Sequence, residues 1–329
     1  RTSNWVPLFA SSRLKVMING IHYKNWASPG GGVVSRKGRS MNRIALVFLA
    51  GALLSALPAI GNTRDDIDPD TRYFAPSGAA KNVSIIFFGG SDGGLPNHDV
   101  ERYTSMGYPC LKIGYFKTKS TPDHLEMIPL EYFEEVIKTF RSRPEIGDKK
   151  IVVYGGSKGG ELALLLSSRC EQIEGVIAKV PSSVVFQGIG GPSSSWSYNG
   201  LPIPFVPYYK PYDYSKVTNN QWLELYELSI TQTKMVAKAA IEVENINGPI
   251  LLLSGTDDAM WPSTRMCEMI VIRLKANKFP HWYKHYAYED AGHSLNDRGV
   301  FGGTIEGNRL ARIDSNQRVM NFLKRVSEE

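Results

Sequence analysis

The sequence predicts an α/β fold with a mainly parallel central sheet and helices on both faces. Short apolar runs rich in β-branched residues alternate along the chain with stretches of helical periodicity, which is typical of such sheets. Runs such as residues 83–88 and 249–254 are apolar without alternation, as expected for strands buried on both faces. A Gly-x-Ser-x-Gly motif at residues 155–159 joins one strand to a helix.

The expected elements follow in order from these patterns. In the helix at residues 129–141, Leu130, Phe133, Ile137 and Phe140 recur at the spacing of one helical face. Further helices are expected over residues 100–106, 162–168, 264–276 and 315–326, and strands over residues 83–88, 108–115, 150–154, 175–180, 249–254 and 283–288. The alternation of the two types predicts crossover connections between parallel strands.

The motif at residues 155–159 has the context of a nucleophile elbow. A strand at residues 150–154 precedes it and a helix at residues 162–168 follows, which is where an α/β-hydrolase fold holds its reactive serine. The turn must push Ser157 Oγ clear of the sheet, and the flanking positions must be small because strand and helix nearly touch there. We therefore predict an α/β-hydrolase fold with Ser157 as nucleophile.

A serine nucleophile needs a base, and the base needs an orienting carboxylate. In this fold the order along the chain is serine, acid, histidine. Asp258 follows the strand at residues 249–254 by a short loop, and His293 follows the last strand, so both are expected beside Ser157 at one edge of the sheet. Asp257 is the alternative acid; otherwise it braces the loop or contacts the substrate.

An oxyanion hole needs two backbone N–H donors. Lys158, at the start of the helix, supplies the first. The second is expected from the Gly-rich loop after residues 83–88, at Gly90 or Ser91, since glycines let the backbone approach a substrate closely. This loop lacks the Lys-Ser/Thr ending of a phosphate-binding P-loop.

Residues 187–214 interrupt the alternation. This segment is dense in Gly, Pro, Ser, Trp and Tyr and is too long for an ordinary connection, so we interpret it as a lid over the active site. Its aromatic residues either line an acyl pocket or pack the insertion onto the body; the candidates are Trp196, Tyr198, Phe205, Tyr208 and Tyr209.

The N-terminal part divides into three expected segments. Residues 41–61 have a basic start, an apolar core and small residues at the end, which is typical of a secretory signal peptide cleaved after Gly61. An uncleaved membrane anchor is the alternative, although the apolar core is short for a span. Residues 1–40 are expected to be an upstream or non-native leader without stable structure, residues 62–80 a linker, and residues 81–329 the catalytic domain. The protein is accordingly expected to be exported, to a periplasm or the medium, or else anchored to a membrane.

Charge and cysteine content indicate which partners, metals and cofactors to expect. Seven of the 38 lysines and arginines lie in residues 1–40, so the remainder holds 31 basic residues against 32 acidic ones. This balance predicts no nucleic-acid partner. Cys110, Cys170 and Cys267 lack metal-ligand spacing, so we expect no metal and no cofactor, and export would allow one disulfide between an undetermined pair.

The sequence resembles a known family in four blocks between residues 83 and 293. It is similar to the C-terminal catalytic domain of the acyl-CoA thioesterase and bile acid-CoA:amino acid N-acyltransferase family. The blocks are Gly-Gly-Ser-Lys-Gly-Gly-Glu-Leu-Ala-Leu (155–164), Pro-Ser-Ser-Val-Val-Phe-Gln-Gly (181–188), Val-Glu-Asn-Ile-Asn-Gly-Pro-Ile-Leu-Leu-Leu-Ser-Gly-Thr-Asp-Asp-Ala-Met-Trp-Pro-Ser (243–263) and Tyr-Glu-Asp-Ala-Gly-His (288–293).

The resemblance implies an α/β-hydrolase with Ser157, Asp258 and His293 as a triad, and a small-molecule acyl thioester as substrate. The acyltransferase branch has a cysteine nucleophile, so Ser157 favours hydrolysis. The residues alone leave three alternatives open, namely a carboxylesterase or lipase acting on oxygen esters, an acyl-CoA-dependent acyltransferase, and a non-catalytic binding protein. They predict no oligomeric state.

Overall fold

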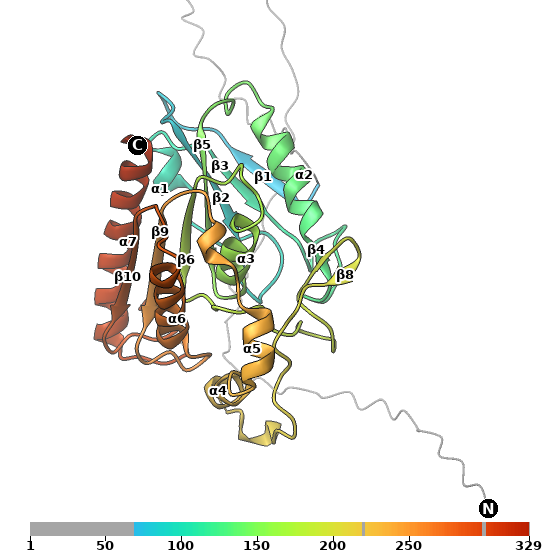
Figure 1. Cartoon of the computed structure of the whole chain (residues 1–329). Coiled ribbons are helices and arrows are strands. Elements are labelled where there is room, and N and C mark those ends of the chain that lie inside the picture. The colour runs from blue at the N-terminus through green and yellow to red at the C-terminus, as the bar shows by residue number, and fades with distance from the viewer. Residues whose placement is uncertain (1–68, 219–220, 298–300, 329) are drawn as a thin grey trace, which may run out of the picture. The chain divides into compact units, whose positions relative to one another are not determined.

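The computed structural model describes residues 69–218, 221–297 and 301–328, and within them the chain builds a seven-stranded sheet in the order β1-β3-β2-β5-β6-β9-β10 (Figure 1). Neighbouring strands run parallel, except that β1 pairs antiparallel with β3. The strands are β1 (Thr71–Phe74), β2 (Val83–Phe88), β3 (Cys110–Ile113), β5 (Lys150–Gly156), β6 (Gly175–Lys179), β9 (Ile250–Gly255) and β10 (Tyr283–Tyr288). The mainly parallel sheet that the sequence predicts is confirmed.

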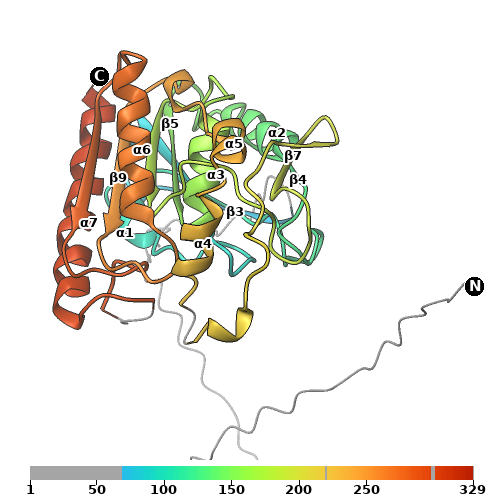
Figure 2. The same ribbon diagram turned by 60° about the horizontal axis from the view of Figure 1, so that its bottom comes forward.

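Helices cover both faces of this sheet, as Figures 1 and 2 show. Side chains of α2, α3 and α6 pack on one face, and side chains of α1 and α7 pack on the other. The helices are α1 (Glu101–Thr104), α2 (Leu130–Arg141), α3 (Lys158–Ser167), α6 (Ser263–Ala276) and α7 (Ile305–Glu328). The three layers have the architecture expected of an α/β-hydrolase.

The strand β2 shows why the central runs carry no polar alternation. Its residues alternate between the two cores: Ile86 and Phe88 face the α2–α3 side, and Ile85 and Phe87 face the α7 side. All four are fully buried. Because both faces of the sheet are covered, both sets of side chains must be apolar.

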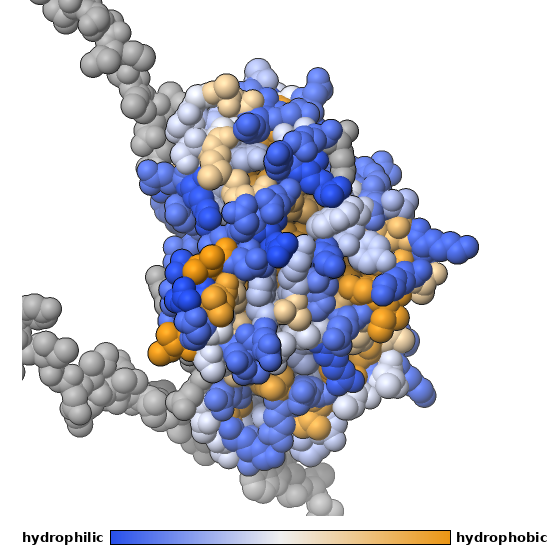
Figure 3. All heavy atoms as spheres, turned by 90° about the vertical axis from the view of Figure 1, so that its left-hand side faces the viewer, coloured by the Kyte–Doolittle hydropathy of each residue, from blue (hydrophilic) through white to orange (hydrophobic). Residues whose placement is uncertain are grey.

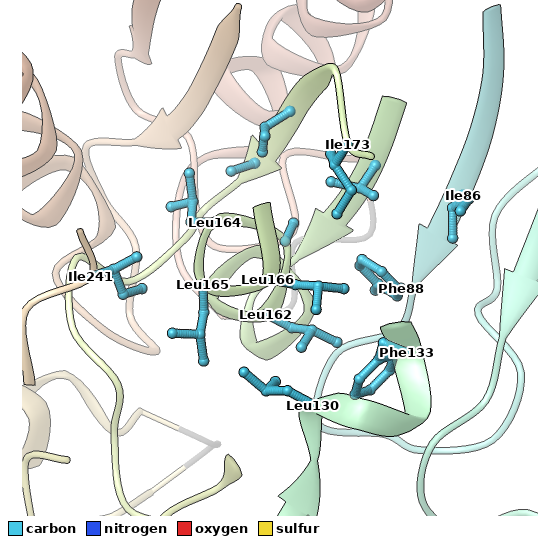
Figure 4. Packing of buried hydrophobic residues seen from close by; sticks show 14 of the residues in the cluster. Ile86, Phe88, Leu130, Phe133, Leu162, Leu164, Leu165, Leu166, Ile173 and Ile241 are labelled. Atoms are coloured by element: carbon cyan, nitrogen blue, oxygen red, sulfur yellow. The ribbon is translucent and has the colours of Figure 1, made fainter. Parts of the chain in front are cut away.

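The helix α3 is enclosed on all sides, which fixes the position of its N-terminus. All of its residues are buried. In Figure 4, Leu162 and Leu166 point toward Phe88 and Phe133, and Ile241 closes the opposite side. From Leu162 to Leu166 the helix is apolar on every side, and it lies between the sheet and the segments that cover it.

The chain between β6 and β9, residues 180–249, forms what we call the cap insertion. It contains β7 (Trp196–Tyr198), β8 (Leu201–Pro202), the 3₁₀ turns η1 (Tyr214–Lys216) and η2 (Val243–Asn245), α4 (Leu223–Ser229) and α5 (Thr233–Ala239). Its strand β7 pairs with β4 (Ile128–Pro129), which precedes α2. The insertion is confirmed, but it extends well beyond the end predicted at residue 214.

Two further predicted boundaries are wrong. The sequence assigns residues 62–80 to a linker, whereas Thr71–Phe74 forms β1 and pairs with β3, a contact that local sequence does not signal. The last helix begins at Ile305 rather than at residue 315. The sequence pattern missed its first turns because their apolar residues Ile305, Leu310 and Ile313 are exposed and form no clear apolar stripe. Figure 3 views the molecule from the α7 side and shows a mostly hydrophilic surface with small apolar patches.

The predicted leader and signal peptide, residues 1–61, lie outside the described residues, so export and membrane anchoring stay predictions. No helix in the described ranges combines the length and apolarity needed to cross a membrane. Cys110, Cys170 and Cys267 are all free thiols, so the disulfide that the sequence allows is not formed. Cys110 lies on β3 and Cys267 on α6, where each fills the core as an apolar side chain.

His98 is a partly buried histidine that gives the fold a pH dependence. Its ring lies 4.8 Å from the ring of Phe87 and 5.1 Å from that of Tyr154. Its Nδ1 atom is buried without a hydrogen-bond partner in the described part of the chain. Burial, together with the nearby cations Lys179 and Lys112, lowers the pKa of His98 to about 3, so the folded protein holds this ring neutral.

We expect the free energy of unfolding to fall on acidification, because the unfolded chain, with a histidine pKa of about 6.5, binds a proton that the folded chain rejects. This contribution is complete above about pH 6.5 and is lost at up to ~1.4 kcal/mol per pH unit as the pH falls toward 3. The free energy of unfolding should be measured in urea at about pH 7 and about pH 5. Its decrease between these pH values should be about 2 kcal/mol smaller in His98→Phe than in the wild type. An equal loss in both proteins would contradict this account.

Candidate active site

Ser157 occupies a strained turn between β5 and α3. Its backbone angles are φ 58° and ψ −123°, outside the regions that residues with a side chain usually adopt. The Ser157 N–H donates to the carbonyl of Lys179 on β6, at 2.9 Å. This is the geometry of a nucleophile elbow, and the side chain is partly exposed at the pocket described below.

The glycines around Ser157 are required by close backbone packing. A Cβ atom on Gly155 would lie 1.9 Å from the carbonyl oxygen of Gly159. A Cβ atom on Gly159 would lie 2.3 Å from the carbonyl oxygen of Gly89, in the loop after β2. Strand, helix and loop therefore meet backbone to backbone, as the motif predicts.

His293 and Asp258 form a buried hydrogen-bonded pair. The Nδ1 atom of His293 lies 2.8 Å from Asp258 Oδ2 and 3.0 Å from Oδ1, and the two residues are 8% and 4% exposed. Asp258 follows β9 and His293 follows β10, so the adjacent parallel strands bring them together. Asp257 is exposed and is not the partner of His293.

Three further donors hold the Asp258 carboxylate. Oδ1 accepts from the backbone N–H groups of Met260, at 2.9 Å, and Trp261, at 3.2 Å. Oδ2 accepts from Ser263 Oγ at 2.6 Å. These bonds hold the carboxylate in place, so that it can fix the orientation and tautomer of His293.

The imidazole of His293 lies next to the pocket that Ser157 lines. Its ring is 5.8 Å from the ring of Trp261 and 6.1 Å from that of Phe301, and both aromatic residues line the same pocket as Ser157. Among the described residues no hydrogen bond joins Ser157 Oγ to His293. Catalytic hydrogen bonds of this kind are often long or poorly aligned until the substrate binds.

The candidate oxyanion donors surround Ser157 from two directions. Lys158 is the first residue of α3, where N–H groups have no partner within the helix. A Cβ atom on Gly90 would lie 3.5 Å from Ser157 Cβ, so the backbone of Gly90 lies beside Ser157. Lys158 and Ser91 both line the pocket. The N-terminus of α3 also favours developing negative charge.

The pocket beside Ser157 has a volume of about 490 Å³, and six of its described lining residues are aromatic. The wall comes from the loop after β2, the elbow, the cap insertion and the loops after β9 and β10. The lining residues are Ser91, Asp92, Ser157, Lys158, Ile189, Gly190, Tyr208, Tyr214, Trp222, Leu225, Tyr226, Met260, Trp261 and Phe301.

Most of the aromatic residues predicted to bind substrate are elsewhere. Trp196 is fully buried and its indole N–H donates to Glu161 at 2.8 Å. Phe205 packs against the core on the α2–α3 side, and the Arg169 guanidinium lies 5.2 Å from the ring centroid of Tyr198. Asp257 also lies outside the set of described residues that line the pocket. Of the predicted aromatics, Tyr208 does line it.

Sequence reasoning missed Tyr214 and the aromatic residues of the pocket that follow it in the chain. Trp222 and Tyr226 are four residues apart at the start of α4, so they share one helical face. Trp261 lies three residues after Asp258 and could have been found by its proximity to the acid. Tyr214 and Phe301 carry no local signal, because they join the pocket only through the path of the cap insertion and the loop after β10.

Comparison with solved structures supports the class of protein that this fold defines. A Pyrococcus horikoshii acylaminoacyl peptidase superposes with a TM-score of 0.52 and 15% identity, over 79% of this chain and 39% of that one. The α/β hydrolase MGS-M1 from a Medee basin deep-sea metagenome superposes with a TM-score of 0.50 and 15% identity, over 80% and 96%. The fold is that of an α/β hydrolase.

Sequence comparison identifies the family. Residues 128–298 match the family model described as BAAT / Acyl-CoA thioester hydrolase C terminal, and the chain belongs to this family. It is 27% identical to the mitochondrial acyl-coenzyme A thioesterase 2 of Mus musculus, over 76% of this chain and 56% of that protein. It is 27% identical to acyl-coenzyme A thioesterase 1 of Homo sapiens, over 62% and 47%. The chain thus spans about half the length of these relatives.

Gly155→Ala should lower the free energy of unfolding by about 3 kcal/mol, because the added Cβ overlaps the Gly159 carbonyl oxygen and the elbow has no room to relax. Gly156→Ala is the matched control, since its Cβ would meet no atom closer than 3.9 Å. The control should change stability by only about 0.5 kcal/mol in urea unfolding. Similar stability of the two variants would show that the elbow is packed less tightly than described.

Proposed function

We propose that this chain is a serine hydrolase that cleaves acyl thioesters, with Ser157 as nucleophile, His293 as base and Asp258 as the orienting acid. The observation that carries the proposal is the buried His293–Asp258 pair next to the pocket that Ser157 lines. Acyl transfer to serine requires these three roles together with an oxyanion hole. The names of the relatives, acyl-coenzyme A thioesterases, support a thioester as substrate.

In the proposed reaction, Ser157 Oγ attacks the acyl carbonyl carbon while His293 Nε2 takes the hydroxyl proton. The carbonyl oxygen becomes an oxyanion, which the N–H of Lys158 and an N–H at Gly90 or Ser91 stabilise. The carbon–sulfur bond then breaks and the imidazolium gives its proton to the leaving thiolate. A water molecule then attacks the acyl-enzyme while His293 takes one of its protons. The carbon–oxygen bond to Ser157 breaks, the imidazolium returns this proton to Ser157 Oγ, and Asp258 stabilises each imidazolium form.

The cap insertion supplies the proposed acyl-binding wall. Tyr208, Trp222, Leu225 and Tyr226 belong to it and line the pocket. Tyr208 and Tyr226 also pack with Trp261 in one hydrophobic cluster. An apolar, aromatic pocket that opens beside the nucleophile suits the hydrocarbon part of an acyl group, while the polar atoms of the reacting carbonyl lie at the elbow.

The same machinery would cleave oxygen esters, so the thioester assignment needs its own test. An acyl-CoA and a p-nitrophenyl ester of the same acyl chain should be compared over a series of chain lengths. We expect the thioester to have the higher kcat/KM and to inhibit turnover of the ester competitively. Higher kcat/KM for the ester would make the chain a carboxylesterase, and conjugates formed with an added amine or alcohol would make it an acyltransferase.

The catalytic roles are tested by matched substitutions. Ser157→Ala should lower kcat/KM by about 10⁴-fold, because no group is left to form the acyl-enzyme. Asp258→Asn should also cost about 10⁴-fold, since the amide favours the wrong tautomer of His293. The neighbouring Asp257→Asn should retain wild-type kinetics, because that side chain is exposed and does not line the pocket.

Labelling by a fluorophosphonate probe gives a second readout of the same proposal. The wild type should be labelled on Ser157, as mapped by mass spectrometry, and Ser157→Ala should not be labelled. Wild-type turnover by folded Ser157→Ala would rule out the mechanism. A wild type that neither reacts with the probe nor hydrolyses any acyl compound would instead indicate a binding protein.

A further inference from the structure

A buried ion pair lies directly behind the elbow and has no role in the reaction as described so far. Lys158 Nζ is 2.6 Å from Glu161 Oε1, and the two side chains are 2% and 0% exposed. Both residues are on the first turn of α3, which begins at Lys158. Removing two charges from water is costly, and such pairs seldom stabilise a fold more than apolar residues of the same size would.

The Glu161 carboxylate ties this first turn to the cap insertion. Its Oε1 atom accepts from the indole Nε1 of Trp196 at 2.8 Å and from the backbone N–H of Phe186 at 3.4 Å. The Lys158 ammonium also lies 5.7 Å from the centroid of the Trp196 ring. One carboxylate oxygen thus joins the residue that carries the first oxyanion donor to two points of the cap insertion.

A second hydrogen bond holds the loop after β2, which carries the other candidate oxyanion donor. The hydroxyl of Tyr115 donates to the carbonyl oxygen of Gly89 at 2.5 Å, one residue before Gly90. Tyr115 is 2% exposed. Burial and the Glu161 carboxylate both raise the pKa of Tyr115, so its hydroxyl keeps the proton that it donates.

Trp196 contacts both Glu161 and Tyr115. Its ring centroid is 5.6 Å from that of Tyr115, and its N–H binds Glu161. Phe133 of α2 packs against both aromatic rings. The result is one continuous buried network behind the site, from Lys158 through Glu161, Trp196 and Tyr115 to Gly89.

We propose that Glu161 and Tyr115 are positioning residues for the two halves of the oxyanion hole, and that Trp196 couples them to the cap insertion. Oxyanion donors act only when they are held at hydrogen-bond distance from the place where charge develops. Glu161 fixes Lys158 through the ammonium group of the lysine side chain. Tyr115 fixes Gly90 through the carbonyl oxygen of Gly89, the residue before it. This inference rests on the proposed function, because it assigns the network to a step of that reaction.

The test uses Glu161→Gln and Tyr115→Phe, each with a control of the same chemistry elsewhere. Glu244→Gln removes a carboxylate charge that pairs with Arg273 on α6. Tyr132→Phe removes a tyrosine hydroxyl that donates to the carbonyl of Gly114 at 2.9 Å. The readouts are kcat and KM for the thioester, and the inhibition constant of a trifluoromethyl ketone that carries the same acyl chain and forms an oxyanion on Ser157.

We expect both test variants to lose about 10²-fold in kcat with little change in KM, because a misplaced donor affects the transition state more than the bound substrate. The inhibition constant of the ketone should rise by the same factor as kcat/KM falls. The two controls should keep wild-type values. A purely structural role would lower the thermal midpoint without this matched change in kcat and ketone binding.

Glu161→Gln alone leaves a buried ammonium unpaired and can prevent folding. Lys158→Met combined with Glu161→Gln removes both charges, while the glutamine amide oxygen still accepts from Trp196; this variant should fold and show the same loss of kcat and ketone affinity. Tyr115→Phe removes a single oxygen and tests the other loop independently.

Wild type and Ser157→Ala, measured in parallel, separate the two proposals. If the wild type turns over substrate and Ser157→Ala does not, the proposed function holds. If, in addition, folded Tyr115→Phe and the Lys158–Glu161 double variant keep wild-type kcat and ketone affinity, the positioning role is overturned while the function stands. An inactive wild type would instead overturn the function itself.

Discussion

The structure depends on one close contact, the backbone packing at the strand-to-helix turn that carries Ser157. There β5, the first turn of α3 and the loop after β2 approach so closely that Gly155 and Gly159 have no room for a Cβ atom. The turn places Ser157 at positive φ, which the surrounding packing must hold in place. The buried helix α3 supplies that packing, because every one of its residues is in the core.

The parallel sheet brings other polar residues close to this turn. Strands β5, β9 and β10 run in the same direction, so the loops that follow them emerge at one edge of the sheet. That is why Ser157, Asp258 and His293, which are far apart in the chain, lie near one pocket. The Asp258 carboxylate is then held by two backbone N–H groups and Ser263, so the His293–Asp258 pair has little freedom to reorient.

The cap insertion has two connections to this edge. Its later part, including α4, supplies aromatic side chains to the pocket wall. Its earlier part, at Phe186 and Trp196, reaches behind the elbow to Glu161. A buried charge needs partners, and here two of them, besides Lys158, come from a segment that also borders the pocket. The pocket wall and the elbow are therefore physically linked through one insertion.

The sequence by itself determined the α/β fold, the elbow, the order of Ser157, Asp258 and His293, and the family, because these depend on local periodicity and on residues adjacent in the chain. Tertiary structure alone decided which aromatic residues line the pocket. Trp196 is buried in the core, where it donates a hydrogen bond to Glu161, while Trp222 and Tyr226 line the pocket. It also decided that Thr71–Phe74 joins the sheet. Such choices are made by contacts between distant segments, which no local pattern records.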